Sequence, residues 1–166
     1  MASGVFFDPM RLLRVAPLIG STGTLVYATA ELVYNSTFLH PSVRKQSDEI
    51  LPKWWKVLFH RSVWVVLALN MTTSTATIAN LVFDYKFSIP TFSTKLYCAG
   101  LAAAVGHLLF VPWVAGPIQD MLGERTGNGA ASDMGRWLGF HRLRLAVADF
   151  PAWVACLGAF LSTPFY

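Results

Sequence analysis

The chain has 166 residues, of which 54% are hydrophobic and only 13% are charged, and its formal net charge is +4. Soluble domains usually carry roughly 25% charged residues, so this composition excludes an ordinary soluble enzyme and indicates a single membrane domain. The basic residues lie in short connections beside apolar segments and not along one polar face, which argues against a nucleic-acid partner.

The first apolar segment, residues 15–38, is long enough to cross a bilayer at about 1.5 Å per residue. A cleaved signal peptide is the alternative, but the small polar residues from Gly20 to Thr24 interrupt its apolar core. Gly20, Thr24 and Ala28 recur every four residues and predict close contact with another helix. Glu31 lies one turn further on, where a buried charge needs a partner.

A polar connection, residues 39–56, leads to the second span, residues 57–83, near whose start lie His60 and Arg61. The middle of this span, residues 70–77, is rich in hydroxyl groups. These can bond to the helix backbone or across to another helix, and we interpret them as packing contacts.

A turn at residues 84–94 precedes the third span, residues 96–114, which contains His107. Within it, Ala102 and Gly106 again predict close helix contact. The span ends at two prolines, which are typical of helix ends and kinks.

A glycine-rich polar stretch, residues 123–133, separates this span from the fourth, residues 140–163. Pro151 removes one backbone donor just after Asp149, and carbonyl groups freed in this way inside a membrane usually face protein or water.

The four spans predict an all-α fold, an integral membrane four-helix antiparallel bundle in one domain with both termini on the same side. Residues 39–61 and 123–144 hold nine of the thirteen lysines and arginines, which places the termini outside the cytosol by the positive-inside rule. We expect a multi-pass protein of the endoplasmic reticulum or another endomembrane.

Ionisable residues from all four spans lie at one level of the predicted bundle. At about 1.5 Å per residue, Glu31, His107 and Asp149 each lie about 10 Å from the same membrane face. Four further residues lie just above them: His60, Arg61, His141 and Arg144. The arginines could instead be interface anchors, and the carboxylates could simply hold helices together. The convergence of ionisable residues from all four spans at one level predicts a single site.

Histidines and carboxylates at one level would also suit a metal ion, because zinc, iron and copper accept both ligand types. The sequence has no closely spaced pair such as His-x-x-x-His, so we assign no metal-ligating residue and keep a metal site as an alternative.

The residues Trp137, His141 and Arg144, spaced as Trp-x-x-x-His-x-x-Arg, resemble the closing motif of the anthrone oxygenase family of small four-span membrane proteins. The Pro-x-x-x-x-Leu pattern from Pro117 to Leu122 and the His40-Pro41 pair are also similar to that family, so the resemblance covers most of the chain. Where the family has Pro-Thr-Asn, this chain has Pro-Ile-Gln, which keeps an amide at Gln119.

The resemblance implies oxidation of an anthrone to a quinone by molecular oxygen in a polyketide pathway. His107, Asp149 or Glu31 would be the base, and Arg144 and His141 would stabilise the oxyanion. Oxygen is the implied co-substrate, and the sequence has no motif for an organic cofactor. The residues expected to bind an apolar aromatic substrate are Trp64, Trp113, Gln119, Trp137, His60 and Arg61.

Two other functions stay open at this point. An intramembrane cyclase or isomerase would protonate an apolar substrate from Asp149 or Glu31 and would consume no oxygen. A non-enzymatic scaffold subunit would use its buried charges only to pair helices. The expected partners are the lipid bilayer and an apolar aromatic small molecule, with a homo-oligomer left open.

Overall fold

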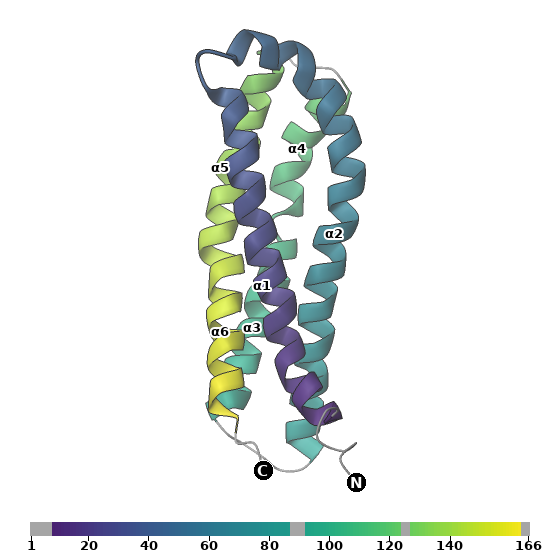
Figure 1. Ribbon diagram of the computed structural model, residues 1–166, viewed down its shortest axis with the longest axis vertical. Helices are drawn as coiled ribbons and strands as arrows, with labels where there is room; N and C mark the ends of the chain where they lie inside the picture. Colours follow the sequence, from purple (N-terminus) through teal and green to yellow (C-terminus); the bar gives the residue numbers. More distant parts are fainter. Residues whose placement is uncertain (1–7, 87–91, 124–126, 164–166) are drawn as a thin grey trace.

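The computed structural model describes residues 8–86, 92–123 and 127–163 and has four helical rods in an antiparallel bundle (Figure 1). The first two rods are single helices, α1 (Pro9–Ser36) and α2 (Arg44–Lys86), joined through a short 3-10 turn, η1 (Thr37–Leu39). The third rod is α3 (Phe92–Leu108) followed by α4 (Val111–Leu122). The fourth is α5 (Ala130–Arg144), the π-helical segment η2 (Leu145–Asp149) and α6 (Phe150–Ser162). The predicted all-α four-helix bundle is therefore confirmed.

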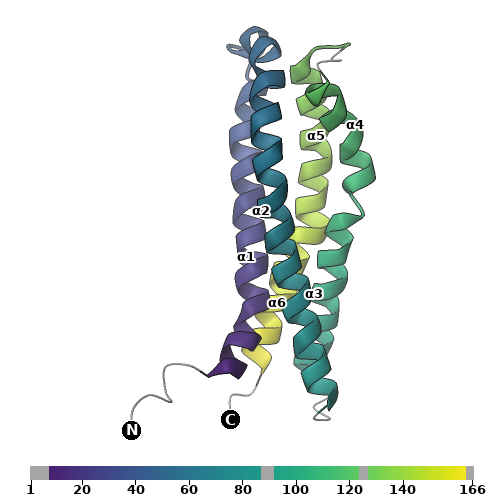
Figure 2. The same cartoon turned by 90° about the vertical axis from the view of Figure 1, so that its right-hand side faces the viewer.

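Three helical segments among the described residues are long and apolar enough to cross a membrane: α2, α3 with α4, and α5 with α6. Their outward faces carry large exposed apolar side chains such as Ile78, Leu109 and Leu161. This is the arrangement that contact with lipid requires. The shorter α1 packs along α2 and α6 (Figure 2). It has exposed apolar side chains of its own, Ile19 and Val26, so all four rods carry exposed apolar side chains.

The helices extend beyond the predicted spans, and most of the polar connection at residues 39–56 is itself helical. Ser47, Leu51 and Trp55 are buried and recur every four residues, so this end of α2 has one face packed on the bundle. Asp48 accepts a hydrogen bond of 2.8 Å from the backbone N–H of Ala131 and thereby caps the first turn of α5. The predicted turn at residues 84–94 includes residues 87–91, which lie outside the described residues, as do residues 124–126 of the predicted glycine-rich stretch.

A buried ion pair that the sequence analysis missed joins the helices at the end of the bundle away from residues 39–56. Arg14 lies 2.6 Å from Asp84, with both side chains nearly inaccessible, and also donates to Asn80 at 3.1 Å. The hydroxyl of Tyr97 donates to the carbonyl oxygen of Arg14 at 3.2 Å. Arg14 therefore links α1, α2 and α3.

The helices α1 and α2 are in close contact at Gly20. A β-carbon at this position would lie 2.5 Å from the Oγ1 atom and 2.9 Å from the backbone nitrogen of Thr73. The close helix contact predicted at Gly20 is confirmed. The predicted close contact at Gly106 is wrong, because nothing lies within 4 Å of a β-carbon built there.

We expect Gly20→Ala to lower the free energy of unfolding by about 1–3 kcal/mol, the usual cost of overpacking a close contact. The matched control is Gly116→Ala, an exposed helical site with open space around the new methyl group. This control should be neutral or slightly stabilising, because alanine favours helix more than glycine does. Melting temperatures of both variants in detergent check the prediction, and equal values would contradict it.

Candidate functional site

An apolar cavity of about 420 Å³ lies between α2 and α4 and extends to α1 and α5. This is the size of pockets that hold drug-sized ligands. Most of its wall is aliphatic and aromatic, while its polar side chains are few: Glu31, Ser62, His107, Gln119 and Arg144. The cavity therefore suits an apolar ligand that meets a small number of polar groups.

Two irregularities in the helices lie beside these polar groups. At the break between α3 and α4, Leu109 and Phe110 bond three residues back, to Gly106 and His107, and Pro112 has no N–H to continue the helix. In η2, Phe150 bonds five residues back, to Leu145, just before Pro151. Such π-helical turns often occur at functional sites.

The π-helical turn determines which side chains meet. In an α-helix, residues five apart point about 140° away from each other around the axis. Bonds between residues five apart instead bring such residues onto one face. As a result, the Nε atom of Arg144 lies 3.3 Å from the Oδ2 atom of Asp149 on the same rod.

The other oxygen of Asp149 binds His107. The distance from Oδ1 of Asp149 to Nδ1 of His107 is 2.6 Å, and both residues are buried. Because the carboxylate accepts, Nδ1 carries the hydrogen and the lone pair of the ring is on Nε2. His107 also lines the cavity. This is the arrangement of a general base oriented by a carboxylate.

His141 is buried and has partners at both ring nitrogens. Its Nε2 donates to the carbonyl oxygen of Ala28 at 2.8 Å, so its Nδ1 accepts from the guanidinium of Arg144 at 3.0 Å. The ring is thus neutral and fixed, and Trp137 stacks on it at 4.6 Å between ring centroids. His141 lies beside Arg144 as the sequence predicted, but its contacts are those of a residue that positions Arg144.

Glu31 completes the group of five predicted catalytic residues. It is partly buried on α1 and lines the same cavity as His107 and Arg144. The structure therefore brings together Glu31, His107, His141, Arg144 and Asp149, from three of the four rods.

The residues predicted to bind substrate divide into two groups. Gln119 and Trp137 line the cavity. The other four do not: Trp64, Trp113, His60 and Arg61. Trp64 and Trp113 are 71% and 55% exposed and point away from the bundle, and His60 and Arg61 are also on the outer face of α2.

The residues that α2 does contribute were missed. Trp55, Phe59, Ser62 and Val66 line the cavity and follow one another at spacings of four, three and four residues. This spacing marks a single face of a helix, and it was a signal that the sequence contained.

The donor atoms of the site offer little for a metal ion. Both nitrogens of His141 and one nitrogen of His107 are already hydrogen-bonded, and the guanidinium of Arg144 adds a positive charge at the centre. Within residues 8–86, 92–123 and 127–163, no three His, Cys, Asp or Glu side chains form a group that could hold a metal ion. We therefore assign no step of the chemistry to a metal.

Comparison with known proteins gives several relatives over nearly the full chain, although no family model and no solved structure matches it. The chain is 33% identical to epoxidase gkaX of Penicillium citrinum, over 92% of this chain and 95% of that protein. It is 30% identical to epoxidase pydX of an Acremonium species, over 92% and 94% of the two chains. It is 28% identical to oxaleimides biosynthesis cluster protein N of Penicillium oxalicum, over 92% and 89%. Two of these relatives are named epoxidases and one is named as a biosynthesis-cluster protein, whereas the sequence motifs had suggested anthrone oxygenases. The chain belongs to the family of the fungal epoxidases gkaX and pydX.

Proposed function

We propose that this protein is a membrane oxygenase of secondary-metabolite biosynthesis that removes a proton from an apolar substrate and exposes the resulting anion to molecular oxygen. The observation that carries the proposal is the buried His107 and Asp149 pair beside Arg144, at one end of an apolar cavity. The pair supplies a base and the guanidinium supplies a cation for the anion that forms. The names of the relatives support an oxidative role.

For an anthrone, the reaction balances without a bound cofactor. Nε2 of His107 takes a proton from the ring methylene, and the electron pair moves to the carbonyl oxygen, which becomes an oxyanion facing Arg144. The carbanion carbon then forms a bond to oxygen and, after the proton returns, gives a hydroperoxide. Loss of water from the hydroperoxide leaves the quinone, so one oxygen molecule yields one quinone and one water.

Epoxide formation is the second candidate, and the names of gkaX and pydX favour it. It fits the same first steps if the substrate carries an alkene near the acidic carbon. The hydroperoxide would transfer its outer oxygen atom to the alkene and become an alcohol, so that both atoms of oxygen remain in the product. The two candidates therefore differ in the fate of the hydroperoxide and not in the base.

The lining of the cavity favours an apolar, lipid-soluble substrate, because aliphatic and aromatic side chains of α2 and α4 make up most of its wall. Such a molecule would be concentrated in the bilayer that surrounds the protein. We include oxygen as the co-substrate and assign no organic cofactor to the reaction.

The test is oxygen consumption by the purified protein in lipid nanodiscs with anthrone as the substrate. We expect one oxygen molecule consumed for each anthraquinone formed, above the rate of nanodiscs without protein, with labelled oxygen incorporated from oxygen-18 gas. An alkene-bearing ketone should give the labelled epoxide if the second candidate holds. A rearranged product without oxygen consumption would instead favour the isomerase, and no product from either substrate would favour the scaffold.

A further inference from the structure

The carboxyl group of Glu31 has no role in the steps assigned to His107 and Arg144. Its side chain makes no hydrogen bond and no ion pair with any residue that the structure describes. Fully buried polar atoms without a hydrogen-bond partner occur, among the described residues, only on Asn35, Trp55 and Asn70. Both carboxyl oxygens of the partly buried Glu31 therefore have accessible surface. They can meet a ligand without losing a contact within the protein.

This accessible surface faces the interior of the bundle. Ala28 and Asn35, three residues before Glu31 and four after it, are buried, and residues at these spacings share one face of a helix. Val26 and Val33, which are 63% and 56% exposed, point about 140° and 160° away from Glu31 around the axis of α1. The outer side of α1 is thus opposite to Glu31, so its carboxyl group opens into the large cavity that it lines.

Glu31 shares the cavity with the base and the guanidinium. His107 and Arg144 line the cavity with it, and the same three side chains also line a second, narrow space. The charge of Arg144 is balanced by Asp149, 3.3 Å from its Nε atom, and His107 acts as a base only when it is neutral. An ionised Glu31 would then be an uncompensated charge in an apolar cavity, which is unfavourable, so the neutral carboxylic acid is the favoured form.

The last step of the proposed reaction needs an acid. Loss of water from the hydroperoxide requires a base for the hydrogen that remains on carbon and a proton for the oxygen that leaves. His107 cannot supply that proton while it acts as the base, and the guanidinium of Arg144 does not give up a proton in proteins.

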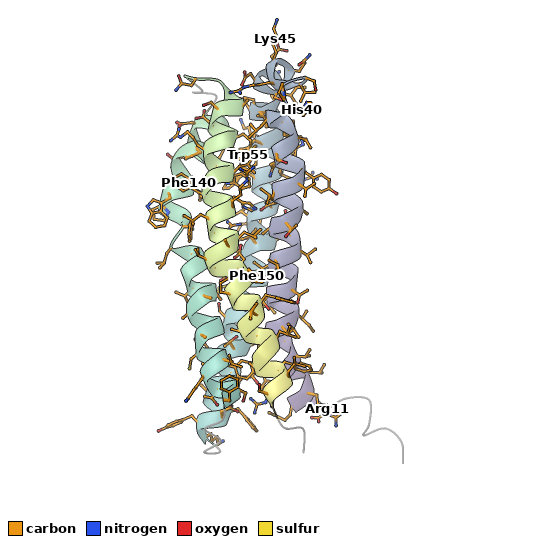
Figure 3. All side chains as sticks on the ribbon, turned by 90° about the vertical axis from the view of Figure 1, so that its left-hand side faces the viewer. Arg11, His40, Lys45, Trp55, Phe140 and Phe150 are labelled. Atoms are coloured by element: carbon orange, nitrogen blue, oxygen red, sulfur yellow. The ribbon has the colours of Figure 1, made fainter. Side chains whose placement is uncertain are left out.

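Water is a poor source of this proton, because the site lies away from both ends of the bundle. Phe150 directly follows Asp149 in the chain, and Figure 3 shows it between Arg11 at one end and Lys45 at the other. The cavity beside the site has mostly apolar walls. A side chain of the site is therefore the better proton donor.

We propose that Glu31 is the general acid for the second half of the reaction, an inference that rests on the proposed function because its substrate is the hydroperoxide. Nε2 of His107 takes the hydrogen from the carbon that carries the hydroperoxide, and the electron pair of that C–H bond forms the carbonyl. The O–O bond breaks, its electron pair leaves with the outer oxygen as hydroxide, and the proton of Glu31 converts this hydroxide into water. The proton on His107 then passes to the carboxylate of Glu31, which restores both groups.

The test supplies the 10-hydroperoxide of anthrone to the protein in nanodiscs under argon and measures the rate of anthraquinone formation. Nanodiscs without protein correct for the spontaneous reaction. The comparison substrate is the acetyl ester of the same hydroperoxide, from which acetate leaves without needing a proton. Glu31→Gln keeps the length of the side chain and a hydrogen-bond donor but has no acidic proton. Glu49→Gln is the matched control, because Glu49 is an exposed glutamate of α2 outside the cavity.

We expect Glu31→Gln to slow quinone formation from the hydroperoxide by about 10²- to 10⁴-fold, the range for loss of a general acid. The rate with the acetyl ester should stay near wild type, which also shows that the variant is folded, and Glu49→Gln should change neither rate. Equal losses with both substrates would assign Glu31 to binding or structure and overturn the inference, as would a normal rate with the hydroperoxide. A wild-type protein that does not accelerate the hydroperoxide reaction would overturn it too, whereas a failure of the proposed oxygenation would show separately in the oxygen-consumption assay.

Discussion

Replacing His107 by glutamine should reduce anthrone-dependent oxygen consumption by about 10²- to 10⁴-fold, the range for loss of a general base. Glutamine can still donate a hydrogen bond to Asp149, so the buried carboxylate keeps a partner in place of the 2.6 Å contact. It has no lone pair basic enough to take a proton from carbon. The fold should therefore survive while turnover is lost, and oxygen consumption together with the melting temperature measures both.

The matched control is His60→Gln, which changes the same residue type on the exposed face of α2. His60 bonds to the carbonyl oxygen of Lys56, one turn before it, and lies edge-on to the ring of Phe59. It is exposed and has no contact with the site, so both turnover and melting temperature should stay near wild type. Near-normal turnover in His107→Gln would remove His107 from the mechanism. A similar loss in both variants would show that the assay responds to something other than the site.

Much of the site followed from helix geometry applied to the sequence. The rise per residue converts a position in the chain into a depth, so residues as far apart as Glu31 and Asp149 could be assigned to one level. The rarity of charge inside a membrane then made that level a candidate site. The structure brings these residues to the same level of the bundle, because the depth of a residue depends only on its position along its helix.

Depth does not determine the direction in which a side chain points. His60 and Arg61 were expected beside the site from their level, yet they face outward, because each step along a helix turns the side chain by about 100°. The inward face of α2 is recognisable from the spacing of Trp55, Phe59 and Ser62, which follow one another at four and three residues. Predicting which way a side chain faces therefore requires the rotation per residue around the helix as well as the rise along it.

The contact between Arg144 and Asp149 could not be predicted from regular helix geometry. The α-helical rule places Arg144 with residues three and four away, which correctly pairs it with His141 but separates it from Asp149. The π-helical turn before Pro151 changes the register by one residue. The proline was noted in the sequence as a lost donor, but its effect on which residues share a face required the structure.

Arg144→Lys should reduce oxygen consumption by about 10²- to 10³-fold, comparable to the loss of one donor that stabilises an oxyanion. The guanidinium of Arg144 contacts two partners, Asp149 at 3.3 Å and His141 at 3.0 Å, and lines the cavity as well. Its planar fork allows these contacts at the same time. The ammonium of lysine keeps the charge but has no such fork, so it cannot hold the same geometry toward both partners and the substrate.

Arg144→Ala should in addition destabilise the protein, by about 3–5 kcal/mol if it behaves like other broken buried ion pairs, because Asp149 would lose its cation. The lysine variant should lose far less stability, so melting temperature and turnover separate the two roles of the residue. The matched control is Arg142→Lys, an exposed arginine two residues earlier on α5 that can extend to the membrane surface in either form. Near-normal turnover in Arg144→Lys would mean that charge alone is sufficient and that the fork has no part in the reaction. Parallel losses of melting temperature and turnover in both variants at position 144 would assign Arg144 to holding η2 in place, and the oxyanion would then need another partner.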